Sequence, residues 1–118
     1  MKAEERDYVD FLRDILDSID KIGSFIEGFD FDEFAEDDKT VYAVIRALEI
    51  IGEATKNLPE SLKSGHPEVP WRKMTGTRDK VIHGYFGVEL EVVWTTIKED
   101  IPSTKPLIEK ILGEVENY

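Results

Sequence analysis

A chain of 118 residues can bury one hydrophobic core and is too short for two, so we expect a single domain over residues 1–118. The absence of cysteine excludes disulfides, thiolate zinc sites and cysteine nucleophiles, and a formal net charge of −11 argues against uniform coating of a nucleic acid. The acidic N-terminus does not resemble a signal peptide and no apolar run is long enough for a bilayer, so we expect a cytoplasmic protein without membrane contact.

The first 26 residues carry apolar side chains at steps of three and four, which is the spacing of one face of a helix. These positions are Tyr8, Leu12, Ile15, Ile19, Ile22 and Ile26. Between Gly28 and Lys39 a glycine and clustered acids interrupt the pattern. We therefore expect a long first helix followed by a loop or short turn, whose phenylalanines Phe29, Phe31 and Phe34 could pack against the core.

A second helix is expected to begin near Asp38 or Lys39 and to end before Pro59, because the residue that precedes a proline disfavours helix. Its buried face is predicted to contain Val41, Val44 or Ile45, Leu48, Ile51 and Thr55. Residues 59–70 contain three prolines and a glycine. This composition predicts a connector with at most one helical turn.

The remaining sequence predicts a short helical segment from Trp71 to His83, interrupted around Gly76, and then a long helical stretch. The long stretch has one apolar phase across Pro102 and Pro106, which indicates one helix kinked near Pro102 or two nearly collinear helices. The phase consists of Leu90, Trp94, Ile97, Ile101, Ile108, Ile111 and Val115. No alternating strand pattern is present, so we predict an all-α, up-and-down bundle of four or five helices.

The segment from residue 77 to 86 places a fixed cation, an imidazole and a phenol within eight residues. RNA can be cleaved without a metal when its 2′-hydroxyl attacks the adjacent phosphorus, a reaction that needs proton transfer and stabilisation of negative charge. His83 could transfer the proton and Arg78 could hold two phosphate oxygens. Asp79 could orient either side chain or cap the helix. The alternative is structural: Arg78 pairs with a surface acid and His83 is a residue at a helix C-terminus.

Helix geometry limits the catalytic interpretation. Five residues along an ideal helix place Arg78 and His83 about 140° apart. The two side chains converge only if the helix end is distorted or if a two-fold dimer brings two copies of it across a cleft. A homodimer is therefore a mechanistic expectation.

Basic residues cluster around this segment. Arg72, Lys73 and Lys80 join Arg78 within a stretch whose single acid is Asp79. The cluster is either a solvated basic turn or a focused anion site on an acidic protein, in which case Arg72, Lys73 and Lys80 would bind the substrate.

Other polar and aromatic candidates favour structural roles. His66 is expected to be an exposed connector residue, and Trp71 and Trp94 are interpreted as core residues, with base stacking as the alternative. Glu49 and Glu53 lie one helical turn apart, but no third ligand has suitable spacing. Arg46 can pair with Glu49, so we expect neither a metal nor a cofactor.

The run from Arg78 to Tyr85 resembles the R-x4-H-x-Y motif of HEPN proteins, and specifically HepT-type toxins encoded beside a minimal nucleotidyltransferase antitoxin. The resemblance covers most of the chain in order. It includes Arg46–Ala54, Val69–Trp71, Val93–Trp94 and Asp100–Pro102.

This resemblance implies a homodimeric helical bundle and a metal-independent endoribonuclease centre built from Arg78 and His83, with Asp79 in support and RNA such as tRNA or mRNA as substrate. It also implies that the antitoxin transfers adenylate from ATP to Tyr85 and thereby blocks the RNA cleft. From the residues alone, Tyr85 would be a packing aromatic. The alternative function is a non-catalytic or nucleotide-binding helical partner that regulates a nucleotidyltransferase.

Overall fold

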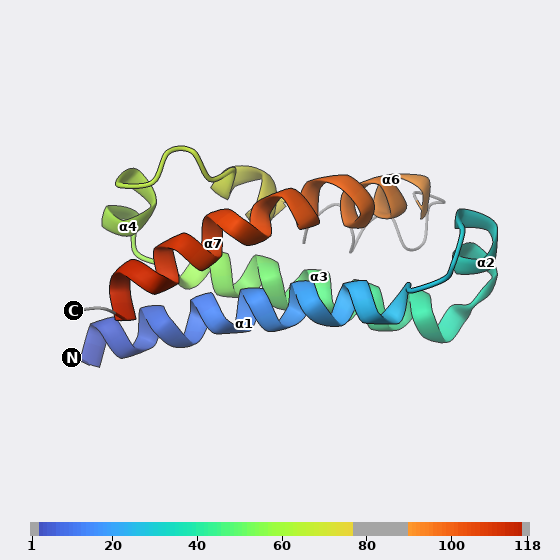
Figure 1. Ribbon diagram of the computed structural model, residues 1–118, viewed down its shortest axis with the longest axis horizontal. Helices are drawn as coiled ribbons and strands as arrows, with labels where there is room; N and C mark the ends of the chain where they lie inside the picture. Colours follow the sequence, from blue (N-terminus) through green and yellow to red (C-terminus); the bar gives the residue numbers. More distant parts are fainter. Residues whose placement is uncertain (1–2, 77–89, 117–118) are drawn as a thin grey trace.

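In the computed structural model, the described residues are 3–76 and 90–116, with side chains described from residue 8 onward. Every helix or strand assigned among these residues is a helix, which confirms the predicted all-α class. The chain forms an elongated bundle with extents of 45 × 26 × 23 Å. Figure 1 shows α1 and α3 side by side, with the C-terminal helical stretch running lengthwise along the bundle and α7 packed against α1. None of the described helices is long and apolar enough to cross a membrane.

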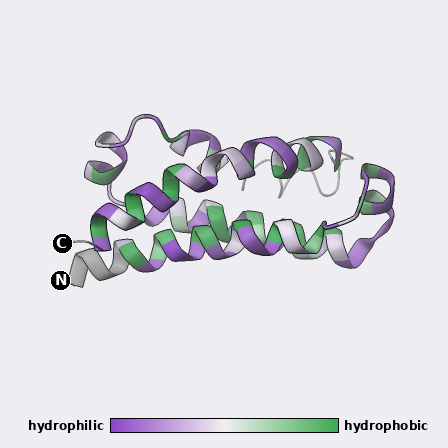
Figure 2. Ribbon diagram, in the orientation of Figure 1, coloured by the Kyte–Doolittle hydropathy of each residue, from purple (hydrophilic) through white to green (hydrophobic). Residues whose placement is uncertain are grey.

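Helix α1 spans Ala3–Phe25 and packs against α3 and α7. Its predicted apolar face is confirmed from Leu12 onward: Leu12, Ile15, Ile19 and Ile22 are buried, and Ile26 continues the same face just beyond the helix. Tyr8, the first predicted member, is partly buried. Figure 2 shows the corresponding alternation of hydrophobic and hydrophilic residues along the ribbon. The apolar periodicity of the sequence is therefore the direct cause of the α1–α3 contact.

The link between α1 and α3 is more ordered than the predicted loop or short turn. Gly28 has φ +80°, a conformation that side chains with a Cβ rarely adopt, and it reverses the chain after α1. Helix α2, Phe31–Glu36, then begins with a capping box in which Asp30 accepts the Glu33 N–H at 2.8 Å. The Phe34 side chain is fully buried, so α2 closes one end of the core.

Helix α3 spans Asp38–Asn57, close to the predicted boundaries. Asp37 caps it by accepting the Thr40 N–H at 3.1 Å, and Leu58 is extended before Pro59. All members of the predicted face are buried: Val41, Val44, Ile45, Leu48, Ile51 and Thr55. The Thr55 hydroxyl donates to the Ile51 carbonyl at 2.7 Å, so this polar atom is satisfied within the helix.

The connector contains the expected single helical turn, α4, Glu60–Ser64. Residues 71–76 are again helical, which confirms the described part of the element predicted to begin at Trp71. Met74 is buried and anchors this segment in the core. Both α4 and the segment 71–76 are short, so the bundle is built chiefly from α1, α3 and the C-terminal stretch.

The C-terminal stretch is one helical path with a widened turn. Helix α6, Leu90–Thr95, leads into the π-helical turn η1, Thr96–Asp100, and then into α7, Ile101–Glu116. The Ile101 N–H donates to the Thr96 carbonyl, five residues back. The predicted irregularity near Pro102 thus takes the form of a π turn, because a proline cannot donate the next helical hydrogen bond.

The π turn also preserves the buried face. Val93, Ile97 and Ile101 are all buried although they are separated by two successive steps of four. In an α-helix each such step rotates a side chain about 40° away from the preceding one, and a wider turn reduces that drift. The face continues through Thr104, Ile108 and Ile111 in α7.

Candidate functional site

The motif residues predicted to carry the chemistry lie outside the described residues. They are Arg78, Asp79, Lys80, His83 and Tyr85. The structure describes the chain on both sides of them, from the segment 71–76 and from Leu90 at the start of α6. The described part of the candidate site therefore consists of the elements that flank the motif.

The segment 71–76, which leads into the motif, is held by its first residue. The Trp71 Nε1–H donates to two backbone carbonyls, Lys63 at 3.1 Å and His66 at 3.0 Å. The indole is half-buried and packs against the core. The predicted packing role of Trp71 is confirmed for the buried part of the indole. Its N–H additionally joins the connector to the segment.

Lys73 forms an ion pair with a distant element. Its Nζ lies 3.3 Å from Asp100 Oδ2 in η1, and the two side chains are 61% and 35% exposed. Exposed pairs of this kind stabilise a fold weakly. The contact nevertheless joins the chain on the two sides of the motif, and a phosphate that binds Lys73 would compete with Asp100.

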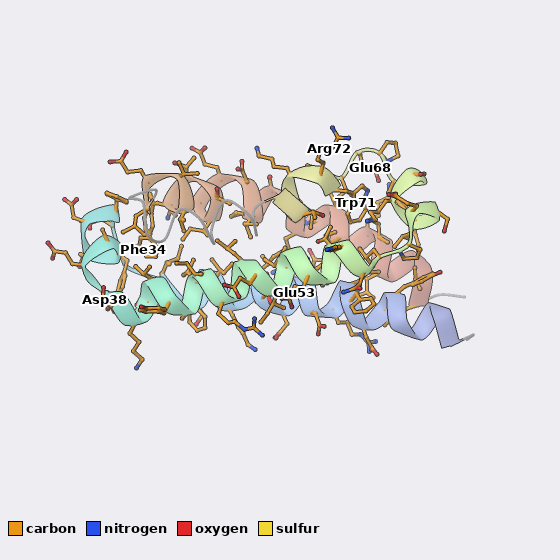
Figure 3. All side chains as sticks on the ribbon, turned by 180° about the vertical axis from the view of Figure 1, so that it is seen from behind. Phe34, Asp38, Glu53, Glu68, Trp71 and Arg72 are labelled. Atoms are coloured by element: carbon orange, nitrogen blue, oxygen red, sulfur yellow. The ribbon has the colours of Figure 1, made fainter. Side chains whose placement is uncertain are left out.

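Arg72 differs from Lys73 in its surroundings. Figure 3 shows its side chain extending outward from the segment 71–76, and the residue is exposed. Within the part of the chain that the structure describes, no carboxylate forms a salt bridge with it. Its guanidinium is accessible to an anion from solvent.

Arg72 lines an open groove of about 550 Å³ between α4 and the segment 71–76. The lining residues are Glu60, Lys63 and Ser64 from α4, and Trp71, Arg72, Thr75 and Gly76 from the segment. The sequence predicted Arg72 as a substrate-binding residue but gave no such prediction for Lys63 or Ser64. Their place in a proline-rich connector carries no local signal that they would face a basic segment.

The expectation that His66 is an exposed connector residue is wrong. Its side chain is 19% exposed and lies between two carboxylates, with Nδ1 3.3 Å from Glu68 Oε1 and Nε2 3.6 Å from Glu114 Oε2. Glu114 belongs to α7, so a tertiary contact encloses the imidazole. A hydrogen bond from its own backbone N–H lowers the pKa of Glu68, and His66 and Lys110 act in the same direction.

Trp94 is confirmed as a core residue. Its ring lies 5.1 Å from that of Phe34 and 6.3 Å from that of Phe31, measured between centroids. The Lys98 ammonium lies 5.4 Å from the Trp94 ring centroid. These contacts account for the indole without a nucleic-acid base.

The acidic pair on α3 behaves as a structural feature. The Arg46 guanidinium lies 3.3 Å from Glu49 Oε2, as expected from their spacing. Glu53 occupies the next turn and is partly buried. Among residues 3–76 and 90–116 there is no group of three or more His, Cys, Asp or Glu side chains that could hold a metal ion.

The chain belongs to the HepT-like family. The family model described as "Ribonuclease HepT-like" matches residues 15–111, which include α1 from Ile15 onward, α2, α3, α6 and most of α7. The all-helical bundle described above is consistent with this match.

Several curated proteins are similar over nearly the whole chain. The "Probable ribonuclease HepT" of Thermococcus cleftensis is 53% identical over 91% of this chain and 97% of its own length. The "Putative RNase MJ0127" of Methanocaldococcus jannaschii is 45% identical over 95% of this chain and 93% of its own length. The "Putative RNase TTE0752" of Caldanaerobacter subterraneus subsp. tengcongensis is 40% identical over 86% of this chain and 91% of its own. A comparison with solved structures found no significant match.

Proposed function

We propose that this protein is a metal-independent endoribonuclease and the toxin of a two-component toxin–antitoxin system. The observation that carries the proposal is membership of the HepT-like ribonuclease family together with an intact R-x4-H-x-Y motif in a basic segment. We propose cellular RNA such as tRNA or mRNA as the substrate.

In the proposed reaction the RNA supplies its own nucleophile. The 2′-oxygen attacks the adjacent phosphorus, a base removes the 2′-proton, and the bond from phosphorus to the 5′-oxygen breaks as that oxygen gains a proton. The products are a 2′,3′-cyclic phosphate and a 5′-hydroxyl. His83 transfers protons, Arg78 stabilises the charge on the phosphate oxygens, and Asp79 orients one of these side chains.

The proposed site requires two copies of the chain. Arg78 and His83 do not share one face of an ideal helix, so a two-fold dimer would place the arginine of one subunit beside the histidine of the other. Acid, base and phosphate clamp would then come from both subunits. This arrangement makes the homodimer part of the catalytic mechanism.

We further propose that a minimal nucleotidyltransferase antitoxin neutralises the nuclease by transferring adenylate from ATP to Tyr85. The Tyr85 oxygen attacks the α-phosphorus of ATP, pyrophosphate leaves, and the phenol proton passes to a base or to water. The added phosphate is anionic and the adenosine is bulky, so the group would repel and obstruct RNA near Arg78 and His83.

An RNA cleavage assay in excess chelator tests the central proposal. The purified, unmodified protein should cut RNA and leave 2′,3′-cyclic phosphate ends. His83→Ala should lose cleavage by about 100-fold or more, the usual size of a general acid–base contribution, while circular dichroism shows that it remains folded.

A different outcome would favour the alternative function. The net charge of −11 and the acid at Asp79 are compatible with a non-catalytic partner that regulates a nucleotidyltransferase. Cleavage that persists in His83→Ala would reject the assigned mechanism. Tight binding to such an enzyme without any RNA cleavage would select the regulatory partner.

A further inference from the structure

The groove between α4 and the segment 71–76 has the chemistry of a site for single-stranded RNA. Lys63 and Arg72 contribute two cations to its lining, and Trp71 contributes part of an indole. An ammonium and a guanidinium are the common protein partners of backbone phosphates, while an indole offers an apolar surface to a base of any sequence. Ser64 and Thr75 add hydroxyl groups that can donate to phosphate or ribose oxygens.

Hydrogen bonds connect the two sides of the groove. Both carbonyls that accept the Trp71 Nε1–H belong to the connector that carries Lys63, so the indole and one side of the groove move together. Met74 is buried one turn further along the segment. The indole and the backbone on both sides of the groove are therefore held in place before a ligand binds, which reduces the entropic cost of binding.

The groove is close to the motif in the sequence. Gly76 lines the groove and stands two residues before Arg78 in the sequence. Two trans peptide units separate the corresponding Cα atoms by at most about 8 Å. A strand held near Arg78 therefore needs to extend only a short distance to reach the groove.

Charge adds a reason for a dedicated groove. A protein with a net charge of −11 repels RNA over long range, so the strand needs local cations to remain bound. Arg72 is exposed, and no described carboxylate forms a salt bridge with it. Glu60 is the one carboxylate among the described lining residues and would repel a bound phosphate. Its removal should therefore strengthen RNA binding, the opposite of the effect expected for Lys63 and Arg72.

We propose that this groove binds the RNA strand beside the scissile phosphate, with backbone phosphates at Lys63 and Arg72 and a base against Trp71. The inference rests on the proposed ribonuclease function and deepens it. It adds Lys63 and Ser64 to the basic residues that the sequence predicted to bind substrate, and it favours base stacking, the alternative role, for the exposed part of Trp71.

Binding is measured by fluorescence anisotropy with a labelled 12-nucleotide single-stranded RNA of mixed sequence, in the His83→Ala background so that the RNA stays intact. Arg72→Gln and Lys63→Gln should each weaken binding by about fivefold, the size of one charge-assisted contact worth about 1 kcal/mol. Each should also reduce the slope of log K against log salt by about 0.7, which corresponds to one phosphate contact on a single strand. Glu60→Gln should tighten binding.

Arg13→Gln and Glu27→Gln are the matched controls. They change the net charge by the same amount as Arg72→Gln and Glu60→Gln, and both residues are exposed outside the groove. Binding in either control should match the parent protein. An equal effect of Arg13→Gln and Arg72→Gln would mean that net charge alone is responsible, and the proposal would be wrong.

Tryptophan fluorescence tests the contact between a base and Trp71 separately from the phosphate contacts. Trp94→Phe leaves Trp71 as the one indole in the chain, since the sequence contains two tryptophans. Addition of the RNA should quench this signal, and Arg72→Gln should shift the quenching to higher RNA concentration. Absence of quenching at saturating RNA would overturn the placement of a base against Trp71.

The binding assay tests the groove, and the cleavage assay tests the ribonuclease function, so either proposal can be rejected without the other. Cleavage that depends on His83, together with unchanged RNA binding in Arg72→Gln and Lys63→Gln, would reject the groove and keep the ribonuclease. Groove-dependent binding without cleavage would reject the ribonuclease and keep the groove. If the His83→Ala protein does not bind the RNA at all, the groove proposal is wrong.

Discussion

At the scale of single residues, His66 shows how a tertiary contact changes the role of a side chain. Its connector is rich in proline and glycine, which is typical of an exposed loop, yet Glu114 from α7 closes over the imidazole. Its backbone carbonyl also accepts the Trp71 Nε1–H. The connector is thus fixed to α7 on one side and to the segment leading into the motif on the other.

Glu68 gives this arrangement a dependence on pH. A hydrogen bond from its own backbone N–H lowers the Glu68 pKa, with His66 and Lys110 contributing, so the charged carboxylate is favoured in the folded state. A depressed pKa contributes stability above the unfolded-state value of 4.5, and this contribution is lost as the pH falls through the lower folded-state value.

Glu68→Gln should therefore lower the melting temperature at pH 7, and the difference from wild type should fade below about pH 4.5. Thermal unfolding followed by circular dichroism from pH 3 to pH 8 measures the melting temperatures of the variant and of the wild type. Glu27→Gln, at an exposed position beyond α1, serves as the reference. A difference that stays constant down to pH 3 would contradict the assignment.

At the scale of elements, the C-terminal stretch shows how prolines can be accommodated without redirecting a helix. Pro102 follows the π turn and Pro106 lies inside α7, yet buried residues continue on one face from Val93 to Ile111. The Thr104 hydroxyl donates to the Asp100 carbonyl at 2.9 Å, and the Ser103 hydroxyl to the same atom at 2.8 Å. Side chains therefore supply extra hydrogen bonds where backbone geometry is irregular.

Pro106→Ala should stabilise the protein by about 1–2 kcal/mol. A proline inside a helix costs about 3 kcal/mol relative to alanine. Its removal also makes the unfolded chain more flexible, which lowers the free energy of unfolding by about 0.4–1 kcal/mol. The net gain is smaller again because α7 is already adapted to the proline. Pro106 is exposed, so its replacement leaves no cavity.

Urea unfolding at constant m-value measures this change. Gly113→Ala, also within α7 and with nothing within 4 Å of an added Cβ, is a comparison that tests helix propensity without a proline. A destabilised Pro106→Ala protein would show that the proline is required for the shape of α7.

At the scale of the whole molecule, the described residues place the two ends of the motif segment on one rigid core. Lys73 before the motif pairs with Asp100 after it, and Met74 and Val93 are both part of the buried cluster. The chain is therefore held by the same core before the motif and after it. In the proposed dimer, the motifs of the two subunits would meet across the two-fold axis.

Mixing two inactive variants tests the composite site. If Arg78 and His83 act across the dimer, a heterodimer of Arg78→Ala and His83→Ala contains one intact site. Statistical mixing makes half of the dimers mixed, so about a quarter of the wild-type RNA cleavage should return.

Sedimentation equilibrium establishes the dimer, and each variant alone provides the baseline. A mixture as inactive as its components, with subunit exchange verified by differently tagged chains, would place both side chains in one subunit. That result would remove the mechanistic need for a dimer.

The sequence alone predicted the all-helical class, the buried faces of α1 and α3, the end of α3 before Pro59 and the irregularity near Pro102. These features depend on neighbours three or four residues apart and on proline chemistry, both of which are readable locally. The catalytic roles of Arg78 and His83 are a prediction that rests on the resemblance of the segment to a family motif, because residue type and spacing alone also allow structural roles.

Tertiary structure decided which distant residues meet. The enclosure of His66 by Glu114, the pairing of Lys73 with Asp100, and the joining of Lys63 and Arg72 in one groove each depend on how separate helices are rotated and packed. Hydrophobic periodicity determines which face of a helix is buried. It does not determine which polar side chains pair across neighbouring helices, because many such surface pairs have similar small energies. The groove between α4 and the segment 71–76 is therefore a property of the tertiary structure that the sequence did not predict.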